Sequence, residues 1–361
     1  MEALAPFALI TATAALLVLP VLPALDELRK RRDATPLPTS RHDGRIANLA
    51  EAFQARIEPL RPQLEQCREK RELRKVTFDG MEVLLVGCEA FGFDSATMKG
   101  VSTILCTAGM VVPRSTVVDA DAYAEGTLDL GKGSALRAAV SNGDTTLREE
   151  STILRWLHAR GSAYLRRGSA VYGRLSANDS ILLEQGCGFE RMQAPIIFAV
   201  DGTDEAREEP YSSACPRIDR DFQTDSDGAD LFEPSRPRLR IQGDFAVSAG
   251  DTLNANVIAT GELHVGAGAS VLGNTKSYKD TIVEADAQIH GSVVSQAGIR
   301  LGPRCYVAGP LLAETEVAIG RGSHIGRMDA PTTVSSLRIR IAAGCRLHGT
   351  AWARERGVVE G

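Results

Sequence analysis

Aromatic residues are scarce in this chain of 361 residues, at 5% of the sequence, whereas glycine occurs 34 times. This balance disfavours a helical globule and favours narrow coils built from small and aliphatic side chains. An excess of positive charge is also missing, because the formal net charge is −5. No basic stripe is present to neutralise phosphates, so we expect no nucleic acid partner.

Signatures of catalysis are missing too. The sequence has no serine nucleophile elbow and no His-x-x-x-His pair, and its seven cysteines show no metal-binding spacing. The run from Gly131 to Ser134 resembles the end of a phosphate-binding loop but lacks the upstream glycine, and Asp225 to Asp230 lacks the terminal Glu of a calcium loop. We therefore expect that this protein is not an enzyme, that it has no catalytic, cofactor-binding or metal-ligating residues, and that it binds no cofactor.

Histidines are the remaining candidates for a general base, which an acyltransferase would need. Five of the six fall at outward or corner positions of a repeat, and none lies in a catalytic motif, so we predict that they decorate the surface. We predict outward positions also for Trp156 and Tyr172, where they would offer a sugar-binding or protein-binding patch. The six histidines are His42, His158, His264, His290, His324 and His348.

An aliphatic residue recurs instead at a spacing of 17 or 18 residues through most of the chain, each time with an apolar partner six positions later. A fixed period of this kind is the mark of a solenoid, in which each repeat buries its apolar face by stacking on its neighbours. The lead residues are Val112, Leu130, Leu147, Leu165, Leu183, Val247, Val265, Val283, Leu301, Ile319 and Ile341. Their partners are Val118, Leu136, Ile153, Val171, Phe189, Leu253, Val271, Ile289, Val307, Ile325 and Leu347.

Each repeat reads as one coil of a β-helix. Apolar residues fall at offsets 0, 6, 10 and 16 from the lead residue and alternate with outward ones, so three short strands wrap one coil. The position four residues after the lead is nearly always small, and Cys187, Cys305 and Cys345 occupy it. We predict that these thiols pack inside the coil rather than take part in redox or metal chemistry.

The segment from Ala3 to Leu25 carries no charge and is long enough to cross a hydrocarbon core of about 30 Å. Basic residues from Arg29 to Arg32 follow this segment, whereas none precedes it. The positive-inside rule then predicts a single-pass anchor in a bacterial inner membrane with the bulk of the chain in the cytoplasm. A signal peptide and a buried helix are the alternatives.

Six regions follow from these patterns. Residues 26–79 are expected to form a linker and a short helical stalk interrupted at Pro59 and Pro62. The turn signal Asp79-Gly80 predicts a hairpin within Lys75 to Gly87, at the start of a capped first array. The predicted regions are 1–25 (transmembrane anchor), 26–79 (linker and stalk), 80–200 (first array with cap), 201–237 (exposed acidic loop), 238–352 (second array, with a corner insertion at 328–334) and 353–361 (polar tail).

Two known families have coils of this length. The run from Leu130 resembles the hexapeptide motif of left-handed β-helix acyltransferases, but those enzymes require an aliphatic residue at offset 12, where this chain has Asn142, Ala177 and Ser277. The order from Leu165 to Leu183 and from Leu301 to Ile319 resembles the bactofilins, polymer-forming cytoskeletal proteins of bacteria. This resemblance covers roughly residues 112–200 and 239–350.

The bactofilin resemblance implies a right-handed triangular β-helix, end-to-end assembly without nucleotide and scaffolding of envelope-building enzymes at the inner membrane. We therefore expect a membrane-anchored cytoplasmic scaffold. Its expected partners are itself, the inner membrane through residues 3–25, and a membrane-bound glycan-synthesis enzyme. The alternative is a hexapeptide-type acyltransferase or a β-helix that modifies or binds polysaccharide. A cap over one end of the coils would oppose filament growth.

Overall fold

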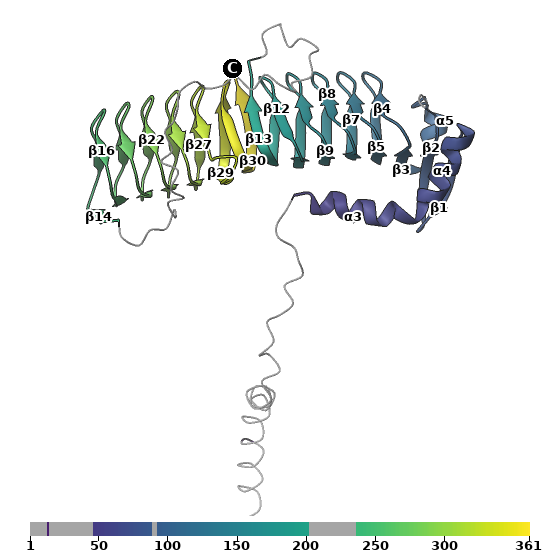
Figure 1. The fold of residues 1–361 in the computed structure, drawn as a ribbon. Helices are drawn as coiled ribbons and strands as arrows, with labels where there is room; N and C mark the ends of the chain where they lie inside the picture. The colour runs from purple at the N-terminus through teal and green to yellow at the C-terminus, as the bar shows by residue number, and fades with distance from the viewer. Residues whose placement is uncertain (1–12, 14–45, 89–91, 202–235) are drawn as a thin grey trace, which may run out of the picture. The chain divides into compact units, whose positions relative to one another are not determined.

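The computed structural model describes residues 46–88, 92–201 and 236–361, together with Thr13, and residues 46–361 form one compact unit. This unit is an all-β solenoid of about 13 turns with a spacing of about 18 residues. Figure 1 shows the coils stacked side by side. No helix of the described residues is long and apolar enough to cross a membrane. The predicted anchor, Ala3 to Leu25, lies outside the described residues except for Thr13, so it stays a prediction.

Three of the described helical elements precede the first strand, and one lies between the second and third strands. The expected interruption of the helical stalk by prolines is confirmed, because a 3₁₀ turn containing Pro59 separates two helices and Pro62 lies in the first turn of the second. The helical elements are α3 (Asn48–Ile57), η2 (Glu58–Leu60), α4 (Arg61–Lys70) and α5 (Ser95–Met98).

The predicted hairpin is also present. Strands β1 (Leu73–Phe78) and β2 (Met81–Val86) pair antiparallel around Asp79 and Gly80, whose φ angles of 52° and 72° suit a tight hairpin turn. Strand β2 then pairs parallel with β3 (Val101–Cys106), which begins the stack of parallel coils.

The coils of the first array present three faces, which we name by their place after the lead residue. The first face carries the lead residues, the second face carries their partners six positions later, and the third face follows at offset 10–12. The first-face strands are β4 (Met110–Val112), β6 (Leu128–Leu130), β8 (Thr145–Leu147), β10 (Ala163–Leu165) and β12 (Ser180–Leu183). Bent strands cover the other two faces: β5 (Val117–Ala124), β7 (Ala135–Ser141), β9 (Thr152–Ala159), β11 (Ala170–Ala177) and β13 (Gly188–Ala199).

The second array has the same three faces, each with its own short strands. Its third face holds β14 (Arg238–Ile241), β17 (Asn256–Ala259), β20 (Thr275–Ser277), β23 (Val293–Ser295) and β26 (Leu311–Ala313). Its first face holds β15 (Phe245–Val247), β18 (Leu263–Val265), β21 (Thr281–Val283), β24 (Ile299–Leu301) and β27 (Glu316–Ile319). Its second face holds β16 (Thr252–Leu253), β19 (Ser270–Val271), β22 (Gln288–Ile289), β25 (Tyr306–Val307) and β28 (His324–Ile325).

The predicted register of the repeats is confirmed at every coil. Lead residues stand opposite lead residues from Val112 to Leu183 and again from Val247 to Ile341. Nearly all of them are fully buried, as are Cys187, Cys305 and Cys345 in the small slot. Burial raises the pKa of each of these three thiols to about 11, consistent with packing residues that stay protonated.

The two arrays meet at their C-terminal coils. Strand β13, the last of the first array, pairs antiparallel with β30 (Arg346–Glu360), the last of the second array. The chain therefore runs toward this junction in both arrays, and Figure 1 shows β13 beside β30 within the stack. Asp201 leaves the first array paired with Arg321 of the second, with oxygen–nitrogen distances of 2.6 and 3.1 Å.

The prediction of a polar tail at 353–361 is wrong. Residues 353–360 belong to β30, which also pairs parallel with β29 (Thr332–Ala342). Ala353 and Val359 are buried at 1% exposure. A segment with few large apolar residues becomes a strand here because β13 and β29 hydrogen-bond it on both sides.

Candidate functional site: the ends and flanks of the solenoid

One end of the solenoid is open among the described residues. Strands β14, β15 and β16 form the first coil of the second array, and each pairs on one side only, with β17, β18 and β19. The carbonyl groups of Pro237 and Ile241 accept hydrogen bonds from the coil of β17. Backbone groups alternate in direction along a parallel strand, so those of Arg238 and Arg240 face the open side.

The apolar interior reaches this open end. Leu239, Phe245 and Leu253 occupy the inward positions of this first coil but are only half-buried. Their counterparts one coil further in, Val257, Leu263 and Val271, are 0–1% exposed. An exposed strand edge over an exposed apolar layer is a template for pairing with another chain.

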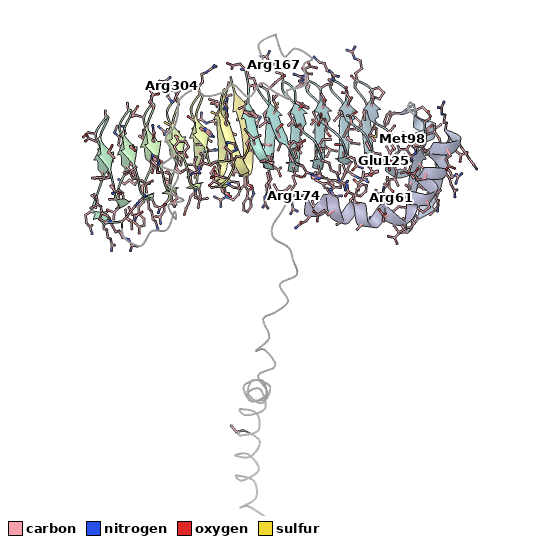
Figure 2. The ribbon with its side chains drawn as sticks, viewed as in Figure 1. Arg61, Met98, Glu125, Arg167, Arg174 and Arg304 are labelled. Carbon is pink, nitrogen blue, oxygen red and sulfur yellow. The ribbon has the colours of Figure 1, made fainter. Side chains whose placement is uncertain are left out.

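The opposite end is closed by the hairpin and the helices. Helix α4 packs on β2, where Gly87 lies so close to Cys67 that a Cβ would stand 1.9 Å from the Cys67 carbonyl oxygen. Glu125, which follows β5, forms ion pairs with Arg61 and Arg68 of this helix at 3.8 and 3.5 Å. Figure 2 labels Arg61 and Glu125 at this end of the solenoid. These contacts place α4 over the coil and leave the charged strand β1 outermost.

Helix α5 closes the rest of this end. The Asp94 carboxylate caps the helix by accepting hydrogen bonds from the backbone N–H groups of Ala96 and Thr97. This cap also holds the pKa of Asp94 below its usual range. Phe93 and Met98 pack against the core from this side. Among the described residues, the core at this end is therefore covered by the hairpin, α4 and α5, although β1 pairs on one side only, with β2.

The junction shows how two coil ends of this chain fit together. The part of β13 on the second face pairs with the part of β30 on the first face, and the part of β13 on the first face pairs with the part of β30 on the second face. The third-face parts of the two strands pair with each other. A local two-fold axis through the third face produces this exchange. Phe189, Met192, Leu347 and Ala351 at this contact are 0–3% exposed.

The third face is covered on the first array and exposed on the second. Phe53 of α3 packs edge-on against Trp156, with 5.4 Å between ring centroids. Trp156 is outward but only 7% exposed, so the prediction that it lies on an open surface is wrong; Tyr172, at 52%, is exposed as predicted. Leu312 and Trp352 on the second array, where no described helix covers them, are 38% and 42% exposed.

The expectation that all histidines lie on the surface holds only in part. His264 is exposed beside Glu284, and His42 lies outside the described residues. His158 and His348 are 7% and 6% exposed. His158 Nδ1 lies 2.8 Å from the Ser176 hydroxyl, and burial, followed by the charge of Arg160, lowers its pKa. Both histidines occupy outward positions of the ladder, yet both are buried. His348 is covered by the opposite array, where the Pro195 carbonyl oxygen lies 3.0 Å from its Nδ1, and no local sequence pattern indicates this contact.

The run from Gly131 to Ser134, which resembles the end of a phosphate-binding loop, is a corner of a coil. Ser134 is 1% exposed, and its hydroxyl donates to the Pro113 carbonyl oxygen at 2.5 Å. Lys132 points to Glu150 at 3.8 Å. The segment from Asp225 to Asp230 lies outside the described residues. Within the described part of the chain, no three His, Cys, Asp or Glu side chains gather as metal ligands.

The fold defines the class: a two-array β-solenoid with one capped end, one internal junction and one open end. Comparison with protein families, with curated proteins and with solved structures finds no match for this chain.

Proposed function

We propose that this protein is a membrane-anchored cytoplasmic scaffold of the bactofilin type, with right-handed triangular coils, which associates with itself through the open end at β14, β15 and β16. The observation that carries this proposal is the unpaired coil, whose apolar layer is half-exposed while every interior coil is closed. Its second role would be to hold a glycan-synthesis enzyme beside the bilayer of a bacterial inner membrane.

The capping of the other end limits how far such assembly goes. A solenoid with two open ends would grow into a filament, whereas one open end per chain closes after a single contact. The expected product is a dimer joined through its β14 ends. The junction of β13 and β30 supports this geometry, because it joins two coil ends of the same chain in antiparallel pairing.

The point where the chain enters the solenoid supports a flank attachment. Ile46 is 3% exposed, and its backbone N–H donates to the side-chain oxygen of Gln193, in β13, at 3.2 Å. A tether that arrives there holds the solenoid near its junction and leaves the open end free to pair. This step rests on the predicted anchor at residues 3–25.

The test is sedimentation of the full chain in detergent, without nucleotide, at physiological salt. We expect a dimer for the natural sequence and a monomer for Arg240→Pro, because proline removes a backbone N–H that faces the open side. The matched control, Arg240→Ala, keeps that N–H and should remain dimeric.

Other outcomes decide against the proposal. A monomeric natural chain would mean that the open end is not a contact surface. Long filaments would mean that the capped end also associates, and a compact trimer would favour the acyltransferase alternative.

A further inference from the structure

Aromatic and imidazole rings line the second face of the second array and lead to the junction. The centroids of His290, Tyr306 and His324 follow one another at 5.9 Å, and His348 lies 5.1 Å beyond His324. The last two rings stand on neighbouring coils, since β28 carries His324 and β30 carries His348. The row therefore ends in two histidines held side by side by the β-ladder.

The two imidazoles face each other through their Nε2 atoms, which are 3.0 Å apart. His348 Nδ1 lies 3.0 Å from the Pro195 carbonyl oxygen in β13. A carbonyl oxygen only accepts, so Nδ1 of His348 carries the proton, and its Nε2 presents a lone pair when the ring is neutral. The orientation of His348 is thus set by a backbone group of the opposite array.

This arrangement matches half of a metal coordination shell. Two nitrogens bound to one zinc ion at about 2.0–2.1 Å lie about 2.8–3.4 Å apart for angles between 90° and the tetrahedral value. A metal-bound histidine also characteristically donates its other ring N–H to a carbonyl or carboxylate, as His348 does. The observed nitrogen–nitrogen separation of 3.0 Å therefore lies within the range that a single ion can bridge.

In the metal-free pair the Nε2–H of His324 donates to the Nε2 lone pair of His348, so a bound ion would replace this proton. Burial, then the charges of His348 and Arg346, lower the pKa of His324 to about 4. Burial also lowers the pKa of His348, although its bond to Pro195 and the charge of Asp329 oppose this.

Three further charged side chains, Arg346, Asp329 and Arg327, lie in this region. Arg346 stacks on Phe198 at 5.6 Å, and Asp329 pairs with Arg327 in the corner insertion beside the rings. Asp329 is the carboxylate that would offset part of the charge of a bound cation.

We propose that His324 and His348 form a two-histidine site for a divalent transition metal ion, of the zinc, nickel or copper type, with water completing the shell. Imidazole nitrogen suits these ions and not magnesium or calcium, which take oxygen ligands. The ion would cross-link the last two coils of the second array, and the strand β30 in the last of these coils pairs with the first array.

Thermal unfolding of the full chain in detergent tests this site, after stripping with a chelator and without an affinity tag. Zinc chloride should raise the melting temperature of the natural chain, because an ion that binds only the folded state stabilises it. The double variant His324→Gln/His348→Gln should abolish this rise and each single variant should reduce it, whereas His264→Gln and His290→Gln should keep it. Magnesium chloride should have no effect on any of them.

A spectroscopic measurement separates loss of the site from loss of the fold. One equivalent of copper(II) should give an electron paramagnetic resonance spectrum with coupling to two nitrogens, reduced to one in His324→Gln. The proposal is overturned if zinc does not shift the melting temperature at millimolar concentration. It is also overturned if the shift survives in the double variant, which would place the ion elsewhere. These results are independent of whether the open end forms dimers.

Discussion

At the scale of single residues, close approach between coils decides which side chains are allowed. The junction depends on Gly357, where a Cβ would stand 2.2 Å from the Phe189 ring. Gly188 lies on the same strand as Phe189, and a Cβ there would meet the Ala170 Cβ at 3.4 Å, an ordinary contact. Both glycines therefore lie at the junction of β13 and β30, but only at Gly357 would an added Cβ overlap a neighbouring side chain.

We predict that Gly357→Ala lowers the free energy of unfolding by about 1–3 kcal/mol, since the ring of Phe189 must move within a packed contact. Gly188→Ala should change it by less than about 1 kcal/mol. Chemical denaturation of the two variants measures the difference. Equal stability of both would show that the contact between β13 and β30 is looser than described.

At the scale of elements, the solenoid depends on a helix that lies outside its repeats. Helix α3 covers the third face through Phe53, and a second apolar cluster joins this helix and α4 to β2, β7 and β9. Burial of an aromatic pair of this kind contributes about 0.5–1.5 kcal/mol beyond its area. The helix is therefore part of the folded unit.

We predict that Phe53→Ala exposes Trp156 and shifts its fluorescence emission to the red. The measurement is made with Trp352→Phe as the background, because Trp352 is the other tryptophan and is 42% exposed. Leu49→Ala serves as the control, because Leu49 lies on the same helix and is 38% exposed. An unchanged spectrum in Phe53→Ala would mean that α3 does not cover this face in solution.

At the scale of the whole described unit, the reversal of the second array sets the distance between its ends. Val111, near the capped end, is separated from Ala246, at the open end, by twelve ladder steps through the junction. At about 4.8 Å for each step, the separation is roughly 55–60 Å. A solenoid that continued in one direction would place the two sites only about 30 Å apart.

We predict that spin labels at Val111→Cys and Ala246→Cys report the longer distance by double electron–electron resonance. Cys88→Ser and Cys215→Ser remove the thiols that are half-buried or outside the described residues. Dilution with unlabelled chain removes signals between copies. A distance near 30 Å would refute the antiparallel junction.

The sequence alone determined the coil, its period and its register. Lead residues such as Leu165 and Leu301, with a small residue four positions on, define which side chains point inward, because burial in a solenoid is local and repeats with each turn. The hairpin at Asp79 and the interruption at Pro59 were equally readable, since turn geometry and the missing proline N–H act within a few residues.

Only the tertiary structure decided how the arrays meet. The 34 residues 202–235 could reach either end of the second array, because a chain of that length spans up to about 110 Å. The pairing of β13 with β30, the strand at 353–361 and the cover over Trp156 and His348 all depend on contacts between residues distant in sequence. Such contacts produce no periodic pattern in the sequence, and they determine which end of each array is capped, joined to the other array or open.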